Sequence, residues 1–164
     1  MKKIALWATH ISVLTRAFDV SKGDVVEVGT GFFSSTLLDW LCAVFDRKLV
    51  SYETNEHWFN IAKRKQSDYH DVIFVKNWDD IPLLDRHWGL AFIDHDPALR
   101  RAVDAGRLKD HADYVVIHDS EPQHESIHNY ESIYPLFKYR YDYKKVVPWT
   151  TVLSNFYSLE KFEC

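Results

Sequence analysis

Short apolar runs alternate along this chain with longer stretches in which apolar residues recur every three or four positions. The short runs predict five strands, at Asp24–Val28, Lys48–Glu53, Asp71–Lys76, Gly89–Asp94 and Asp113–His118. Runs rich in Val, Ile, Leu and Phe are typical of strands that are covered on both faces, as in a parallel sheet.

The longer stretches predict helices before and between these strands. Pro135 should end or kink the last of them, because proline lacks the N–H that a helix needs. Strands that alternate with helices predict an α/β fold, with a doubly wound, Rossmann-like, mostly parallel sheet and helices on both faces. The predicted helices are His10–Phe18, Ser34–Phe45, Asn55–Lys65, Pro97–Leu108 and Glu125–Phe137.

The last part of the chain departs from this alternation. Lys138–Val147 and Thr150–Leu159 are both β-rich, and no helix fits between them. The two segments should pair antiparallel with each other, or one should insert beside the other at the sheet edge. We therefore expect about seven strands that end in an antiparallel β-pair, in a single domain over residues 1–164.

The composition and charge of the chain limit the kinds of molecule that it is expected to bind. The 164 residues suffice for one domain with a buried core, and the formal net charge is −4. Binding to nucleic acid is not expected, because it usually needs a basic stripe. Cys42 and Cys164 show no metal-ligand spacing, and no apolar run is long enough to span a membrane. We expect a cytoplasmic protein with no membrane partner. The sequence leaves open whether the chain forms a homo-oligomer.

The turn after the first strand carries the most information. It runs from Val25 to Ser34 and contains Gly29-Thr30-Gly31. Gly29 permits a tight turn, Gly31 lets the backbone approach a ligand, and the following helix offers free N–H groups. This pattern predicts a nucleotide-type cofactor at the turn, and a tight turn without a ligand is the alternative.

Glu53 ends the second predicted strand, twenty-two residues beyond Gly31. A carboxylate at this place can accept hydrogen bonds from both hydroxyls of a ribose, and it would repel the 2′-phosphate of NADP. The alternative is a solvated strand end, or a cap for the helix that starts near Asn55.

The stretch Glu27-Val28-Gly29-Thr30-Gly31, with Glu53 after the second strand, resembles the class I S-adenosylmethionine-dependent methyltransferases. The resemblance covers essentially the whole chain and implies S-adenosylmethionine as the cofactor. It implies that Glu27 helps to hold the methionine part and that Glu53 holds the ribose. The other residues that it places around the cofactor are Thr30, Ser34 and the two glycines.

The same resemblance extends to the loop Asn77-Trp78-Asp79-Asp80. In the family this loop flanks the adenine, which implies that Asp79 or Asp80 contacts the exocyclic amine and that Trp78 forms an apolar wall. The alternative is that the two acids cap a short helix at residues 81–84.

Acids and histidines follow the fourth and fifth predicted strands. They are Asp94, His95, Asp96, His118 and Asp119. The carboxyl ends of parallel strands meet at one edge of a sheet, where ligands bind, so these residues should lie together beside the cofactor. Such a cluster can relay protons or bind a divalent metal ion. The alternative is a group that caps helices and binds water, with Asp96-Pro97 as an N-cap followed by the first helical residue.

Asp94 and Asp119 resemble the metal ligands of the catechol O-methyltransferase-like branch, which implies Mg²⁺ at these two residues. Ser120 stands where that branch has Asn, and its lysine base is missing after Asp94. Catalysis would then fall to Asp94, Asp119 and a histidine base, His95 or His118, since histidine titrates near neutrality. The alternative for Asp94 is an approach to the charged sulfonium.

His124 and His128 are four residues apart in the last predicted helix. Two histidines at this spacing can share a metal ion. A polar helix face is the favoured interpretation.

Three functions follow from these features. The leading hypothesis is methyl transfer from S-adenosylmethionine to an oxygen or nitrogen of a small-molecule acceptor. The second is a non-catalytic S-adenosylmethionine-binding or interaction module, since 164 residues leave little room for a substrate lid. The third is an NAD-dependent oxidoreductase, against which the β-rich tail argues.

Overall fold

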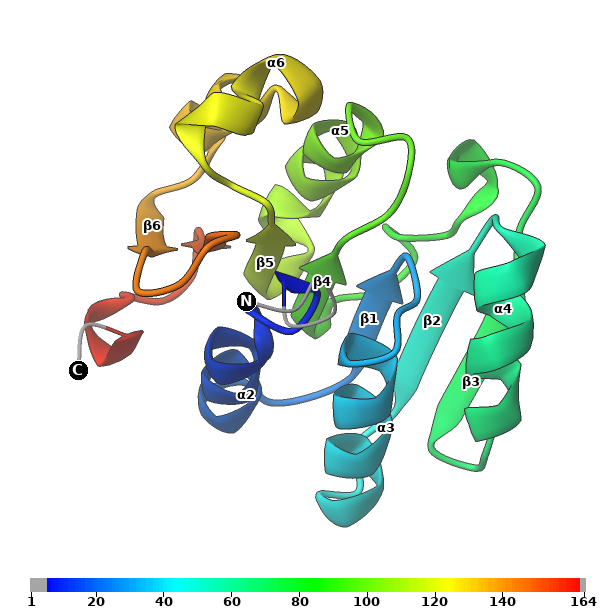
Figure 1. Cartoon of the computed structure of the whole chain (residues 1–164). Helices are drawn as coiled ribbons and strands as arrows, with labels where there is room; N and C mark the ends of the chain where they lie inside the picture. The colour runs from blue at the N-terminus through cyan, green and yellow to red at the C-terminus, as the bar shows by residue number, and fades with distance from the viewer. Residues whose placement is uncertain (1–5, 163–164) are drawn as a thin grey trace.

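A seven-stranded sheet forms the centre of the computed structural model, which describes residues 6–162 (Figure 1). The strand order is β3-β2-β1-β4-β5-β7-β6. The first five strands in this order are parallel, and β7 runs antiparallel to both of its neighbours. The strands are Val25–Val28 (β1), Leu49–Glu53 (β2), His70–Phe74 (β3), Trp88–Ile93 (β4), Ala112–His118 (β5), Tyr139–Tyr143 (β6) and Thr150–Ser154 (β7).

The predicted sheet with its antiparallel β-pair is confirmed. Strand β7 pairs with β6 from Thr150 to Ser154 and also inserts beside β5, where Thr150 lies opposite His118. In doubly wound dinucleotide-binding folds the sixth strand is parallel and extends the order 3-2-1-4-5-6. The antiparallel pair β6–β7 therefore distinguishes this fold from the doubly wound dinucleotide-binding fold.

Helices cover both faces of the sheet, as predicted. Helices α2 and α3 share one core with the sheet, and α5 lies on the opposite face in a second core (Figure 1). Helix α4 packs against β2 and β3. The helices are Ile11–Val20 (α2), Ser34–Val44 (α3), Glu56–Ala62 (α4), Arg100–Arg107 (α5) and Glu125–His128 (α6).

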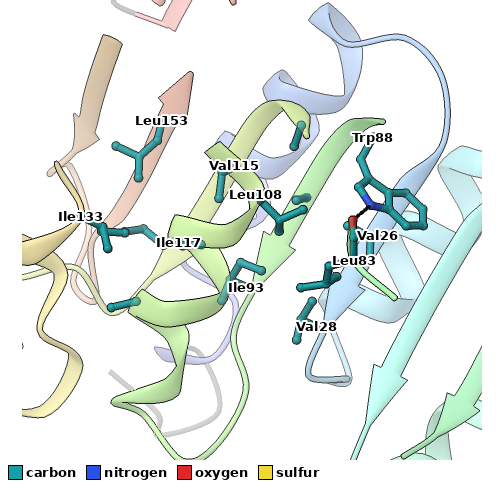
Figure 2. Packing of buried hydrophobic residues seen from close by; sticks show 14 of the residues in the cluster. Val26, Val28, Leu83, Trp88, Ile93, Leu108, Val115, Ile117, Ile133 and Leu153 are labelled. Atoms are coloured by element: carbon teal, nitrogen blue, oxygen red, sulfur yellow. Dashed lines mark hydrogen bonds between the residues drawn. The ribbon is translucent and has the colours of Figure 1, made fainter. Parts of the chain in front are cut away.

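Figure 2 shows the core beneath α5, where aliphatic side chains of adjacent parallel strands pack side by side. The indole of Trp88 is fully enclosed, and its Nε1 donates a hydrogen bond to the carbonyl oxygen of Leu83 at 2.9 Å. Close packing of this kind fixes the relative positions of the strand ends. Among the core residues are Val26, Val28, Ile93, Val115 and Ile117.

The predicted long helix Glu125–Phe137 is wrong. The α-helix ends at His128, because Asn129 adopts a left-handed conformation with φ of 57°, and two short 3₁₀ turns follow. His128 is buried and stacks on Tyr130 with ring centroids 5.1 Å apart. The expected polar helix face is therefore wrong as well.

A further expectation changes at the start of α5. The Asp96–Pro97 peptide bond is cis, and α5 begins only at Arg100, so the predicted N-cap at this dipeptide is wrong.

Cys164 lies outside the described residues. Within residues 6–162, none of the helices combines the length and the apolar character that a membrane crossing requires.

Candidate functional site

The two glycines of the β1–α3 turn have different surroundings. Gly29 has φ of 89°, and a Cβ atom placed on it would lie 2.6 Å from Cα of His95. Only glycine fits here, because the chain leaving β4 passes directly beside it. A Cβ on Gly31 would meet only Oγ of Ser34, at 3.3 Å. Gly29 is therefore needed for the close packing of the turn against the chain after β4. Gly31 instead leaves its backbone accessible to a ligand.

Glu53 holds this turn and the beginning of α4 together. Its Oε2 accepts hydrogen bonds from the N–H and the hydroxyl of Thr30, at 2.8 and 3.0 Å. Its Oε1 accepts from the N–H groups of Thr54 and Asn55, both at 2.8 Å. A carboxylate offers about four acceptor positions. A ribose hydroxyl would therefore have to replace one of these donors, and the rotatable hydroxyl of Thr30 is the one that can turn away. The ribose role stays a prediction.

Glu27 lies beneath the turn in what we call the hydroxyl cluster, which consists of Glu27, Ser35 and Ser51. Oε2 of Glu27 accepts hydrogen bonds from the hydroxyls of Ser35 and Ser51, at 2.9 and 2.6 Å. The Ser35 hydroxyl in turn accepts from the N–H of Gly31 at 3.0 Å. Burial raises the pKa of Glu27 to about 7, although the serine hydroxyls oppose this rise. Glu27 thus reaches the turn through Ser35, and its predicted contact with the methionine part stays a prediction.

A second group, the charged cluster, lies at the ends of β4 and β5 and consists of His10, Asp94, Arg101, His118 and Asp119. One guanidinium nitrogen of Arg101 lies 2.9 Å from Oδ1 of Asp94 and 2.9 Å from Oδ2 of Asp119. Nδ1 of His118 lies 3.3 Å from the remaining oxygen of Asp94 and 3.6 Å from that of Asp119. Burial favours the neutral acid, but the charges of His118 and Arg101 hold the pKa of Asp94 at about 2.

This arrangement does not fit a magnesium ion held by Asp94 and Asp119. Mg²⁺ needs near-octahedral oxygen ligands, whereas the Arg101 guanidinium already bridges the two carboxylates. The hydroxyl of Ser120, at the position of the third ligand in the catechol branch, forms a hydrogen bond with the Thr151 hydroxyl at 2.8 Å. Arginine thus supplies the positive charge between the two acids.

The two histidines of the charged cluster differ in their electrostatics. Burial lowers the pKa of His118, but Asp94 and Asp119 outweigh it and the pKa is raised. His10 packs against it, with ring centroids 4.9 Å apart. Burial, followed by the charge of His118, lowers the pKa of His10 to about 4. At neutral pH His118 is therefore the more cationic ring and His10 is neutral.

His10 and Arg101 were not expected from the sequence at the ends of β4 and β5. The only signal for His10 is a polar residue at the start of an apolar helix face, and Arg101 lies in a helix whose charges are normally solvated. Both are buried in the structure. Tertiary packing alone brings them beside the ends of β4 and β5.

Other predicted site residues contact groups outside the charged cluster. The ring of His95 contacts Trp78 at 4.4 Å, and its Nε2 lies 3.1 Å from Oδ2 of Asp104. Trp78 is buried and donates from Nε1 to the carbonyl oxygen of Asp96 at 2.6 Å. Asp79 is exposed and pairs with Arg100 at 2.6 Å. The proposed adenine contacts and the base role of His95 stay predictions.

The loop that carries Trp78 and Asp79 is capped by a different residue than expected. Oδ1 of Asn77 accepts from the N–H of Asp79 at 3.1 Å and begins a 3₁₀ turn over Trp78–Asp80. Residues 81–84 are not helical. The alternative in which the acids cap a helix there is therefore wrong.

A cavity of about 600 Å³ connects the glycine turn with the charged cluster. This volume lies within the range of pockets for small molecules and cofactors. Trp58 stands at its wall in edge-on contact with Trp7 and Phe32, at centroid distances of 6.3 and 5.0 Å. The lining segments are 30–34 after β1, 53–55 from the last residue of β2, 94–96 after β4 and 118–119 from the last residue of β5, with Leu6, Trp7, His10, Trp58, Arg101 and Pro148.

Known proteins resemble this chain in fold but not in sequence. No family model and no curated protein matches it. The METTL16 MTase domain superposes with a TM-score of 0.64 at 13% identity, over 96% of this chain and 70% of that one. The N-terminal domain of human METTL16 in complex with SAH gives 0.61 at 14%, over 96% and 73%. A methyltransferase from Pyrococcus furiosus gives 0.61 at 19%, over 91% and 84%. The chain has the class I S-adenosylmethionine-dependent methyltransferase fold.

Proposed function

We propose that this chain is a single methyltransferase domain that binds S-adenosylmethionine in the cavity and transfers the methyl group to an oxygen or nitrogen of a small-molecule acceptor. One observation carries the proposal. The cavity joins the Gly31 turn and Glu53 at one end to the ionised Asp94 at the other. A nucleoside and a charged group on one ligand would find partners at these two ends.

The chain's own groups fit such a ligand. The backbone at Gly31 is open toward the cavity, and Glu53 is only 5% exposed but lies at the cavity wall. Asp94 is ionised at neutral pH, because its pKa is about 2. Its negative charge favours a sulfonium nearby, and Arg101 keeps Asp119 from adding an unpaired second charge. S-adenosylmethionine bound there would supply an electrophilic methyl group, and the site would contribute mainly by positioning.

The charges around the cavity support a small-molecule acceptor over a nucleic acid. Among the described residues that line it are four carboxylates, one guanidinium and the His118 ring, with no lysine. Such a surface repels a phosphate backbone, whose binding depends on lysines and arginines. The carboxylates belong to Glu53, Asp94, Asp96 and Asp119, and the guanidinium to Arg101.

Calorimetric titration with S-adenosylhomocysteine tests the proposal. We expect saturable binding to the wild-type protein and an affinity about 10- to 100-fold lower for Glu53→Gln, because hydrogen bonds to a charged group contribute about 1.5–3 kcal/mol each. Glu56→Gln, an exposed acid at the start of α4, is the matched control and should bind as the wild type does.

The outcomes separate the parts of the proposal. Absence of binding to the wild-type protein would remove the methyltransferase function altogether. Unchanged affinity in Glu53→Gln would remove only the ribose assignment. Tight binding without turnover across a panel of hydroxyl and amine acceptors would favour the non-catalytic module.

A further inference from the structure

We propose that His10, Asp94 and His118 form a binding site for a divalent transition-metal ion such as Zn²⁺. One ligand atom from each residue can be chosen so that all three lie within 4.8 Å of one another. Two imidazoles and one carboxylate are a donor set that suits zinc and its neighbours rather than magnesium. The three residues precede α2, follow β4 and end β5, so the fold brings them together from distant parts of the chain.

Hydrogen bonding orients His118 for this role. The Thr9 hydroxyl donates to the carbonyl oxygen of Leu6 at 3.3 Å, so it accepts from the Nε2–H of His118, 2.9 Å away. A metal-ligating histidine typically donates its second ring nitrogen to an oxygen in this way. The other nitrogen, Nδ1, then faces Oδ2 of Asp94 at 3.3 Å. Tetrahedral zinc with bonds of about 2.0–2.1 Å separates neighbouring ligand atoms by about 3.3 Å.

His10 provides a second and independent observation. Its side chain is 2% exposed, yet neither ring nitrogen has a hydrogen-bond partner within residues 6–162. Buried polar groups in folded proteins are nearly always paired. The ring packs on Phe92 with centroids 4.8 Å apart, and no hydrogen bond from the described residues holds it. A small rotation can therefore bring a nitrogen to an ion between Asp94 and His118.

The neighbouring charges leave room for the ion. Arg101 contacts Oδ1 of Asp94, whereas the histidine faces Oδ2. Arg101 also pairs with Asp119, so its charge is shared between two acids. The side chain of Asp94 is 23% exposed and lines the cavity, as His10 and His118 do. A fourth coordination position would therefore open into the cavity, as in catalytic zinc sites.

This site gives the acceptor a place to bind. A hydroxyl coordinated at the open position would lose its proton more readily, as zinc-bound water does. This consequence rests on the proposed methyl transfer, but the metal site itself does not. With the ion bound, Asp94 would hold the metal and the acceptor, and it would no longer offer a free charge to the sulfonium. The two can therefore be tested separately on the same protein.

The test is a metal titration of untagged protein that has been stripped with a chelator. Co²⁺ is followed by its visible absorption and is then displaced by Zn²⁺, and calorimetry gives the stoichiometry. We expect one equivalent of Zn²⁺ per chain. His10→Phe keeps the ring packing on Phe92 but has no ligand atom, and Asp94→Asn keeps the size of the side chain. Each should weaken Zn²⁺ binding by more than about 100-fold, the upper range for loss of a second-shell partner.

His87→Ala is the matched control, because His87 is an exposed histidine paired with Asp113 and should leave the affinity unchanged. Circular dichroism shows whether each variant is folded. If His10→Phe does not fold, the Zn²⁺ affinity of Asp94→Asn provides the test. The inference is overturned if the wild-type protein binds no stoichiometric Zn²⁺, or if the folded variants bind it as tightly. Titration of the stripped protein with S-adenosylhomocysteine shows separately whether the cofactor proposal stands.

Discussion

The hydroxyl cluster and the charged cluster have their acids on neighbouring strands of the sheet but differ in what surrounds these acids. Glu27 belongs to β1 and Asp94 follows β4, the strand next to it. Glu27 is fully enclosed and bonded to the neutral hydroxyls of Ser35 and Ser51. Asp94 faces the Arg101 guanidinium and the His118 ring, and it lines the cavity.

The same chemical group therefore acquires opposite properties on neighbouring strands. Burial raises the pKa of Glu27 to about 7, whereas cationic partners hold that of Asp94 at about 2 in spite of burial. A carboxyl that can stay neutral supports the shape of the turn without placing charge beneath it. A carboxylate that stays ionised can attract a cation at the cavity. The first cluster is suited to positioning and the second to binding.

The largest expected effect comes from removing the cation that bridges the charged cluster. Arg101→Met leaves Asp94 and Asp119 as adjacent acids that share only the His118 ring. Breaking a buried ion pair from one side costs about 3–5 kcal/mol. Urea unfolding at neutral pH should show this loss in the free energy of unfolding. The loss should shrink at lower pH, where the unpaired carboxylates can take up protons.

Arg86→Met provides the comparison for this substitution. Arg86 pairs with Asp24 at 3.0 Å, but the two side chains are 52% and 35% exposed. An exposed ion pair contributes about 0–1 kcal/mol. Equal losses in the two variants would contradict a special role for Arg101 as the bridge between the acids.

Glu27→Gln should change the pH dependence of stability. The folded-state pKa of Glu27 lies above its unfolded value, so its contribution to stability is present below pH 4.5 and is lost as the pH rises through about 7. A rise in pKa from 4.5 to about 7 corresponds to about 3 kcal/mol. The wild type should therefore lose about this much relative to Glu27→Gln between acidic and mildly alkaline pH, measured by urea unfolding across the range.

The difference between the two proteins isolates Glu27. His10 also titrates in this range and acts in the opposite direction, because its folded-state pKa is lowered. Both proteins contain His10, so its contribution cancels when the curves are subtracted. Parallel curves for wild type and variant would show that Glu27 is already ionised when buried.

Much of the fold follows from local patterns in the sequence. The five parallel strands are confirmed because continuous apolar runs mark strands buried on both faces, and the β-rich tail does pair antiparallel. The helix over residues 125–137 fails because apolar spacing alone cannot reveal that Asn129 takes the left-handed conformation. Periodicity reports which faces are buried, whereas helix ends depend on single residues.

The candidate site could be predicted only where it follows the strand ends. Asp94, His118 and Asp119 lie together because parallel strands end at one edge. His10 and Arg101 could not be placed there, since their positions depend on how helices pack over the two faces of the sheet. Nor could the sequence show that hydroxyls, rather than water or a ligand, would surround Glu27.

The smallest expected effect belongs to Ser35→Ala in the hydroxyl cluster. Ser35 joins the N–H of Gly31 to Glu27 and is fully buried, and it is not among the residues that line the cavity. Its loss should reduce the free energy of unfolding by about 1–2 kcal/mol, the range for a hydrogen bond whose partner stays buried. Affinity for S-adenosylhomocysteine should fall less than in Glu53→Gln, because Ser35 acts only through the shape of the turn.

Ser12→Ala, the same substitution at an exposed position in the first turn of α2, serves as the control and should change neither quantity. Urea unfolding and calorimetry are measured on the same preparations. If Ser35→Ala kept full stability but lost as much affinity as Glu53→Gln, Ser35 would have to contact the ligand itself. The hydroxyl cluster would then be part of the binding surface, and its separation from the charged cluster would no longer hold.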